Sequence, residues 1–167
     1  MQEQSLQIRE MGELSEQVYD DDNFVEGKVI EVVDSRYKVI DTCDKGSTSG
    51  FQGMLVENLD RQTGEPKYVF AFRGTEPLEF WDNFAISDIA YMGSSHAPQQ
   101  MKDAMKFVHD MMDDYDISSS NTAFTGHSLG GSIAGMASYV YGFDAYTYNG
   151  FGIENLLWDA DDTSDQD

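Results

Sequence analysis

A serine set between glycines, after an apolar strand pattern and before a run of small residues, constrains the fold of this chain most. The stretch reads NTAFTGHSLGGSIAGMASYVYG, and Ser128 is the serine of Gly126-x-Ser128-x-Gly130. Such a pattern is typical of a sharp turn from a strand into a helix, with the serine exposed at the tip. Ala123 and Phe124 would belong to the strand, and the small residues after Ser128 would let the helix lie close to the sheet. The stretch therefore predicts a nucleophile elbow.

The rest of the chain alternates between helix and strand patterns. Apolar residues at helical spacing predict helices over residues 5–19, 99–115 and 129–141. Runs of β-branched, aromatic or apolar residues predict strands within residues 28–42, 51–59, 67–74, 121–126 and 144–153. This order predicts an α/β-hydrolase-like fold, in which helices flank a sheet that is largely parallel in its second half.

The length of the chain favours one domain. At 167 residues, of which 40% are apolar, the chain can bury a hydrophobic core of its own. We assign this domain to residues 1–153. Residues 154–167 end in DADDTSDQD and are expected to form a flexible acidic tail. The acids of this tail lack the turn glycine and closing glutamate of a calcium loop, so we expect no metal and no cofactor.

Charge and hydropathy exclude several classes of partner. The chain has 31 Asp and Glu against 10 Lys and Arg, for a formal net charge of −21, which disfavours nucleic-acid binding. The single cysteine, Cys43, cannot close an intrachain disulfide. The N-terminus lacks the basic start and apolar run of a secretory signal, and no apolar stretch approaches the ~20 residues that span a bilayer. The default expectation is a cytoplasmic protein, with export by a route that needs no signal left open.

The predicted elbow also predicts where a negative charge could be stabilised. The helix after Ser128 would direct its first N–H groups, that of Leu129 among them, and the positive end of its dipole toward an oxyanion. A second donor is expected from the end of an earlier strand. The strand YVFAFRGTEP ends in Arg73-Gly74-Thr75, so the N–H and hydroxyl of Thr75 are the candidates.

Three segments together resemble the class 3 lipases and their phospholipase-like relatives, which are α/β-hydrolases. The segments are VFAFRGTEPLEFWDNFAISDIAYM, SSHAPQQMKDAMKFV and AFTGHSLGGSIAGMASYV. The residues that match the family pattern are 72–75, Trp81, Asp88, His96 and 126–131, within a resemblance that covers residues 11–153. The resemblance implies hydrolysis of acyl esters in lipids, with Ser128 as nucleophile and with Thr75 and Leu129 in the oxyanion hole.

The chain departs from the family in its histidines. In α/β-hydrolases an acid and then a histidine follow the serine, but none of the three histidines here follows Ser128. His127 is expected to pack locally, because neighbouring side chains diverge at such a turn. His109 is expected on a helix surface. His96 matches a structural histidine of the family and is the candidate base within this chain.

Three explanations of the absent histidine stay open. The chain can be the N-terminal part of a longer hydrolase that lacks the last strands here, one half of an enzyme whose second chain supplies the Asp and His, or a non-catalytic binding module. We interpret the chain as a serine hydrolase of the lipase or esterase type, incomplete as it stands, that cleaves lipid esters through a Ser128 acyl-enzyme. The binding module and the two-chain enzyme are the alternatives, and a peptidase or thioesterase fits the motifs less well.

Overall fold

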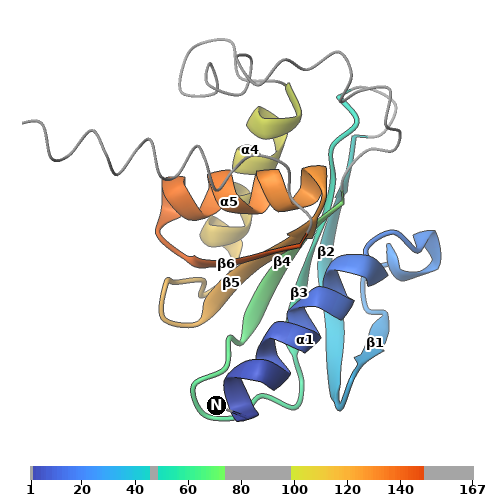
Figure 1. The fold of residues 1–167 in the computed structure, drawn as a ribbon. Coiled ribbons are helices and arrows are strands. Elements are labelled where there is room, and N and C mark those ends of the chain that lie inside the picture. The colour runs from blue at the N-terminus through green and yellow to red at the C-terminus, as the bar shows by residue number, and fades with distance from the viewer. Residues whose placement is uncertain (1, 46–48, 74–98, 149–167) are drawn as a thin grey trace, which may run out of the picture.

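The computed structural model describes residues 2–45, 49–73 and 99–148, and within them six strands form one sheet in chain order (Figure 1). The strands are β1 (Val29–Val32), β2 (Ser35–Asp44), β3 (Gln52–Asn58), β4 (Tyr68–Arg73), β5 (Thr122–His127) and β6 (Asp144–Tyr148). The helices are α1 (Gln2–Gln17), the short 3-10 helix η1 (Asp21–Asn23), α4 (Gln99–Asp114) and α5 (Leu129–Tyr141).

The two halves of the sheet are connected differently. Strands β1 to β4 pair antiparallel with their neighbours through short connections, whereas β4, β5 and β6 pair in parallel. Parallel neighbours need a crossover, and α4 and α5 lie in the chain within the two crossovers. The predicted α/β fold with a parallel second half is confirmed. The end of the last predicted strand and the acidic tail lie outside the described residues.

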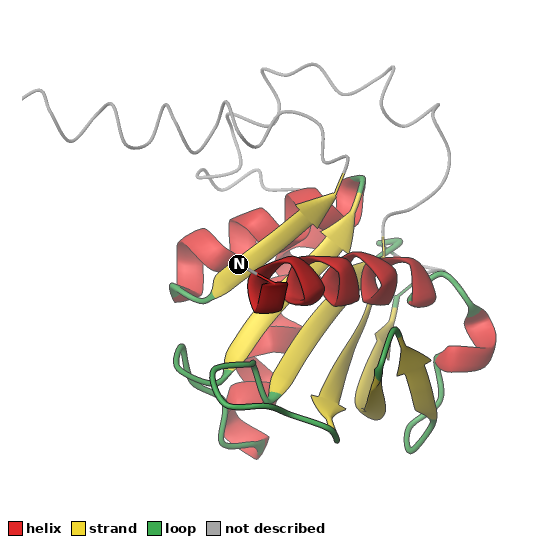
Figure 2. Ribbon diagram, turned by 60° about the horizontal axis from the view of Figure 1, so that its bottom comes forward, coloured by secondary structure: helices red, strands yellow, loops and turns green. Residues whose placement is uncertain are grey.

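Helices cover both faces of the sheet. Figure 2 shows α1 crossing one face, with the other long helices behind the sheet. Along β4, Phe70 and Phe72 belong to the hydrophobic cluster that includes α4 and α5, and Val69 and Ala71 belong to the cluster under α1. Because both faces of β4 are buried, its sequence is apolar from Tyr68 to Phe72 instead of alternating.

Aromatic rings fill the layer between the sheet and α4 and α5. Phe124 on β5 is fully buried, and its ring centroid lies 5.5 Å from that of Phe70 and 5.3 Å from that of Phe143. Each such side chain contributes about 1.5–3 kcal/mol when it is removed from water. Phe107 of α4 is also buried, and His109 is exposed as expected. This packed layer supports the turn at the end of β5.

A buried polar network fastens α1 to the opposite face. The Glu10 carboxylate is 2% exposed and accepts hydrogen bonds from Ser35 Oγ at 2.7 Å and Tyr37 Oη at 3.1 Å. Further along α1, Thr125 Oγ1 of β5 donates to the Met11 carbonyl at 2.8 Å. These hydrogen bonds hold α1 in place against β2 and β5.

None of the helices that the structure describes is long and apolar enough to cross a membrane.

Candidate active site at the strand-to-helix turn

Ser128 has an unusual backbone conformation. It lies between β5 and α5 with φ 57° and ψ −124°, and it is half-buried. A positive φ is unfavourable for a residue with a side chain and costs about 1–3 kcal/mol, so it persists only where the surroundings impose it. Here the Ser128 N–H donates to the Tyr148 carbonyl of β6 at 2.9 Å, and the Ser128 carbonyl accepts from the Ser132 N–H at 3.2 Å. The turn therefore holds its serine in a strained conformation.

Gly126 makes the turn sterically possible. A Cβ atom at this position would lie 2.1 Å from the Gly130 carbonyl oxygen and 2.7 Å from the Gly131 nitrogen. These are backbone atoms of α5 and cannot rotate away. The close approach of strand and helix that the sequence predicts at Gly126 and Gly130 is thus present, and it requires glycine at position 126.

The first turn of α5 begins directly after Ser128. Leu129 is its first residue, and the Leu129 side chain is buried in the cluster that α4 and α5 share. The first N–H groups of a helix have no acceptor within the helix, and the positive end of the helix dipole lies there. This end of α5 can therefore receive negative charge. Gly142 caps the other end of α5, with φ 74°.

The sheet register brings the ends of β4 and β5 together. Phe72 of β4 pairs with Gly126 of β5, so Arg73 and His127, the next residues, end the two neighbouring strands. Thr75 follows Arg73 by two positions and lies outside the described residues, as does His96. The register therefore places Arg73, the last described residue before that segment, beside the turn that carries Ser128.

A group of contacts that the sequence did not predict joins these strand ends to the segment after α1. The Arg73 guanidinium pairs with Asp21, Nη1 to Oδ1 at 2.7 Å, and its central carbon lies 5.5 Å from the Tyr19 ring centroid. Tyr19 Oη donates to the His127 carbonyl at 3.2 Å. The His127 ring packs edge-on against the Tyr19 ring, with centroids 6.2 Å apart, which agrees with the local packing expected of His127. Only long-range contacts could have revealed this group.

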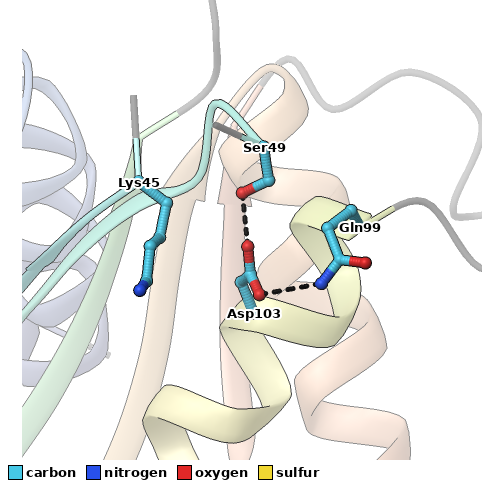
Figure 3. Close-up of a pocket in the computed structure, with 4 residues that line it drawn as sticks. All are labelled: Lys45, Ser49, Gln99 and Asp103. Atoms are coloured by element: carbon cyan, nitrogen blue, oxygen red, sulfur yellow. Dashed lines mark hydrogen bonds between the residues drawn. The ribbon is translucent and has the colours of Figure 1, made fainter. Parts of the chain in front are cut away.

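A polar pocket of about 420 Å³ lies between the β2–β3 connection and the start of α4, lined by Lys45, Ser49, Gln99 and Asp103 (Figure 3). Ser49 Oγ and Gln99 Nε2 both donate to the Asp103 carboxylate, the latter at 3.0 Å. The pairing of Asp44 with Gln52, and of Gln52 with Arg73, puts this pocket at the edge of the sheet where β4 ends. The pocket offers both signs of charge to a polar ligand.

Burial keeps other reactive groups of the described chain neutral. It raises the pKa of the Cys43 thiol, which therefore carries little thiolate at pH 7. Burial, reinforced by Tyr146, raises the pKa of Tyr148 to about 12, so its neutral hydroxyl can donate to the Ile8 carbonyl of α1. No group of three or more His, Cys, Asp or Glu side chains in the described residues is arranged to hold a metal ion.

Comparison with known proteins gives one match. The model of the family described as "Phospholipase-like: Tle-like phospholipase domain" matches residues 10–164. The matched range begins within α1 and includes all six strands and the turn at Ser128, so the similarity does not rest on one motif. Neither the search of curated proteins nor that of solved structures gave a match.

Proposed function

The chain belongs to the phospholipase-like family of Tle-like phospholipase domains, and on that premise we propose that it hydrolyses acyl esters of lipids through an acyl-enzyme at Ser128. The observation that carries the proposal is the Ser128 backbone, with φ 57° and ψ −124° at the tip of the turn. Glycine would adopt this conformation without strain. A strained side chain at such a turn is useful for presenting a hydroxyl to a substrate.

The proposed chemistry is acyl transfer to serine. The Ser128 hydroxyl oxygen attacks the ester carbonyl carbon while a general base takes the hydroxyl proton. The carbonyl oxygen becomes an oxyanion, and the bond from the carbonyl carbon to the alcohol oxygen then breaks. The alcohol leaves with the proton, and water hydrolyses the acyl-enzyme in the same manner. The product pair is a fatty acid and a lipid alcohol or lysolipid.

The oxyanion hole is proposed to consist of two backbone N–H groups. The N–H of Leu129 is supported by its place as the first residue of α5. The N–H of Thr75, with its hydroxyl, is supported by the pairing of β4 with β5, since Thr75 follows β4 closely in the chain. This arrangement is that of the class 3 lipases, the branch to which we assign the chain.

The general base is the part that the described residues do not supply. His109 is exposed on α4, and the His127 ring lies against Tyr19. We propose His96 as the base within this chain. A histidine and an acid from a second polypeptide are the alternative source, and the assay below distinguishes the two.

The proposed substrate is a lipid with a neutral or zwitterionic head group. A chain with a formal net charge of −21 is repelled by an anionic bilayer. The pocket that holds Lys45 and Asp103 offers one cation and one anion at the sheet edge where β4 ends. This pairing of charges suits a head group that carries both signs.

Release of fatty acid from phosphatidylcholine vesicles tests this function. If His96 is the base, the full chain releases fatty acid alone; if the chain is incomplete, release requires the polypeptide that supplies the Asp and His. In either case we expect Ser128→Ala to reduce the rate by roughly a thousandfold or more. Loss of activity in His96→Gln supports a base within the chain. Release that appears only with a second polypeptide supports the two-chain enzyme. Undiminished release by Ser128→Ala contradicts the proposal, and vesicle binding without release favours the binding module.

A further inference from the structure

Resting on the proposed function, we propose that Tyr19 is a positioning residue for Ser128. Its hydroxyl holds the peptide group before Ser128, and its ring holds the end of the neighbouring strand. The segment from Tyr19 to Asp21 would thereby set the position of the nucleophile relative to the end of β4.

The peptide group between His127 and Ser128 is held by hydrogen bonds at both of its polar atoms. Its carbonyl oxygen accepts from Tyr19 Oη at 3.2 Å, and its N–H donates to the Tyr148 carbonyl at 2.9 Å. The plane of this peptide determines the φ angle of Ser128, because φ is the rotation about the bond from its nitrogen to its Cα. Tyr19 therefore acts directly on the strained angle of 57°.

The Tyr19 ring contacts the residue that ends β4. The Arg73 guanidinium lies over this ring, with its central carbon 5.5 Å from the ring centroid, and it also pairs with Asp21. Arg73 ends β4 and His127 ends β5, and these strands are paired as far as Phe72 and Gly126. One segment of chain thus contacts the last residue of each strand at the edge that carries Ser128.

The contacts among Tyr19, Arg73 and Asp21 are expected to position Ser128 more than they stabilise the fold. The Asp21 side chain is 85% exposed, and an ion pair with so exposed a partner contributes little to folding. The Tyr19 ring packs against the hydrophobic cluster under α1, and Tyr19→Phe keeps this packing because it removes only the hydroxyl. A displacement of about 1 Å at a nucleophile can reduce a rate by about a hundredfold. Loss of the Tyr19 hydroxyl should therefore change reactivity more than stability.

A matched control exists in the same strand. Thr125 Oγ1 donates to the Met11 carbonyl, so it also joins β5 to α1 through a single hydroxyl. This hydrogen bond does not involve the peptide between His127 and Ser128. Thr125→Val and Tyr19→Phe each remove one hydroxyl between the sheet and the N-terminal segment, but only Tyr19→Phe removes a hydrogen bond to the carbonyl before the nucleophile.

The test compares labelling of Ser128 by a fluorophosphonate in the full-length wild type, Tyr19→Phe and Thr125→Val, with thermal unfolding of each. We expect Tyr19→Phe to lower the maximal labelling rate about tenfold, which corresponds to about 1.4 kcal/mol. The probe concentration at half the maximal rate should stay unchanged. Thr125→Val should lower the unfolding temperature and leave the labelling rate near that of the wild type. Equal rates in Tyr19→Phe and wild type would overturn the proposal.

Amide hydrogen exchange separates this proposal from the proposed function. If the folded wild type is not labelled, the proposed function of this chain fails, but exchange at the Ser128 amide still reports on Tyr19. We expect exchange to be about tenfold faster in Tyr19→Phe than in the wild type, with no such change in Thr125→Val. An unchanged rate in Tyr19→Phe would overturn the positioning role.

Discussion

Ser128 and Gly126 meet two different requirements of the same turn. Gly126 has no side chain because a Cβ would lie 2.1 Å from the Gly130 carbonyl oxygen, so its identity is set by space. Ser128 has a side chain in spite of a φ of 57°, so its identity is not explained by the fold. A residue whose side chain costs free energy in the native state is a candidate for function.

The strain at Ser128 predicts an unusual order of stability between two variants. Ser128→Ala keeps the Cβ and the strain, whereas Ser128→Gly relieves it. We expect the glycine variant to be more stable than the alanine variant by about 1 kcal/mol in chemical unfolding. Glycine usually gives the less stable protein of such a pair. An alanine variant more stable than the glycine variant would show that the turn does not strain residue 128.

The attachment of α1 depends on neutral groups around one buried carboxylate. Tyr37 Oη donates to Glu10 and accepts from Asn58 Nδ2 at 3.3 Å. Burial, and next the charge of Glu10, raise the pKa of Tyr37 far above the ordinary value of 10.0. The folded state therefore keeps this phenolic proton at pH values where the unfolded chain has lost it. The stability that this group contributes is complete below about pH 10 and falls as the pH rises above it.

Tyr37→Phe should change both the stability and its dependence on pH. At pH 7 we expect the variant to be less stable by about 1–2 kcal/mol, because Glu10 and Asn58 each lose a partner. Above pH 10 its stability should fall less steeply than that of the wild type. Tyr139→Phe, at a site on α5 that is 66% exposed, is the control and should follow the wild type. Parallel declines of wild type and Tyr37→Phe in alkaline urea unfolding would contradict this assignment.

Local patterns predicted the elements around the turn better than the contacts between them. The bounds of α5 are those expected, because a glycine-rich start and Gly142 at the end mark them in the sequence. Phe107 of α4 lies three residues after Ala104 and four before Met111, so helical periodicity is enough to place it on the buried face. Tyr19 and His127 are 108 positions apart, and no local signal indicates that they touch. The predictions for Thr75 and His96 remain untested, because these residues lie outside the described part of the chain.

The whole molecule combines a sheet buried on both faces with a strongly acidic composition. The order of strands and helices predicted the parallel second half, because parallel strands require crossovers. The antiparallel pairing of β1 to β4 was not predicted, although their short connections are compatible with it. The helix over residues 5–19 was predicted, but its attachment to the sheet through the buried Glu10 was not, since a glutamate reads as a surface residue in sequence. The formal net charge of −21 belongs to the whole chain and not to one site.

Self-repulsion of this charge predicts a salt effect on stability. Raising sodium chloride from about 0.01 M to about 0.1 M shortens the Debye length from about 30 Å to about 10 Å. We expect the thermal unfolding midpoint to rise, because the compact state brings the negative charges closest together. Choline chloride should give the same rise, which distinguishes screening from binding of sodium. A midpoint that stays constant or falls would contradict the prediction.

The reactivity of Ser128 is tested most directly by mapping a fluorophosphonate adduct on the full chain. We predict a single addition by intact mass, located by peptide mapping at Ser128 and absent from Ser128→Ala. The folded state of both proteins is verified by circular dichroism. An adduct at Ser128 means that the turn activates its serine. A folded chain that gains no adduct, or gains one elsewhere, contradicts an acyl-enzyme at Ser128 in this polypeptide.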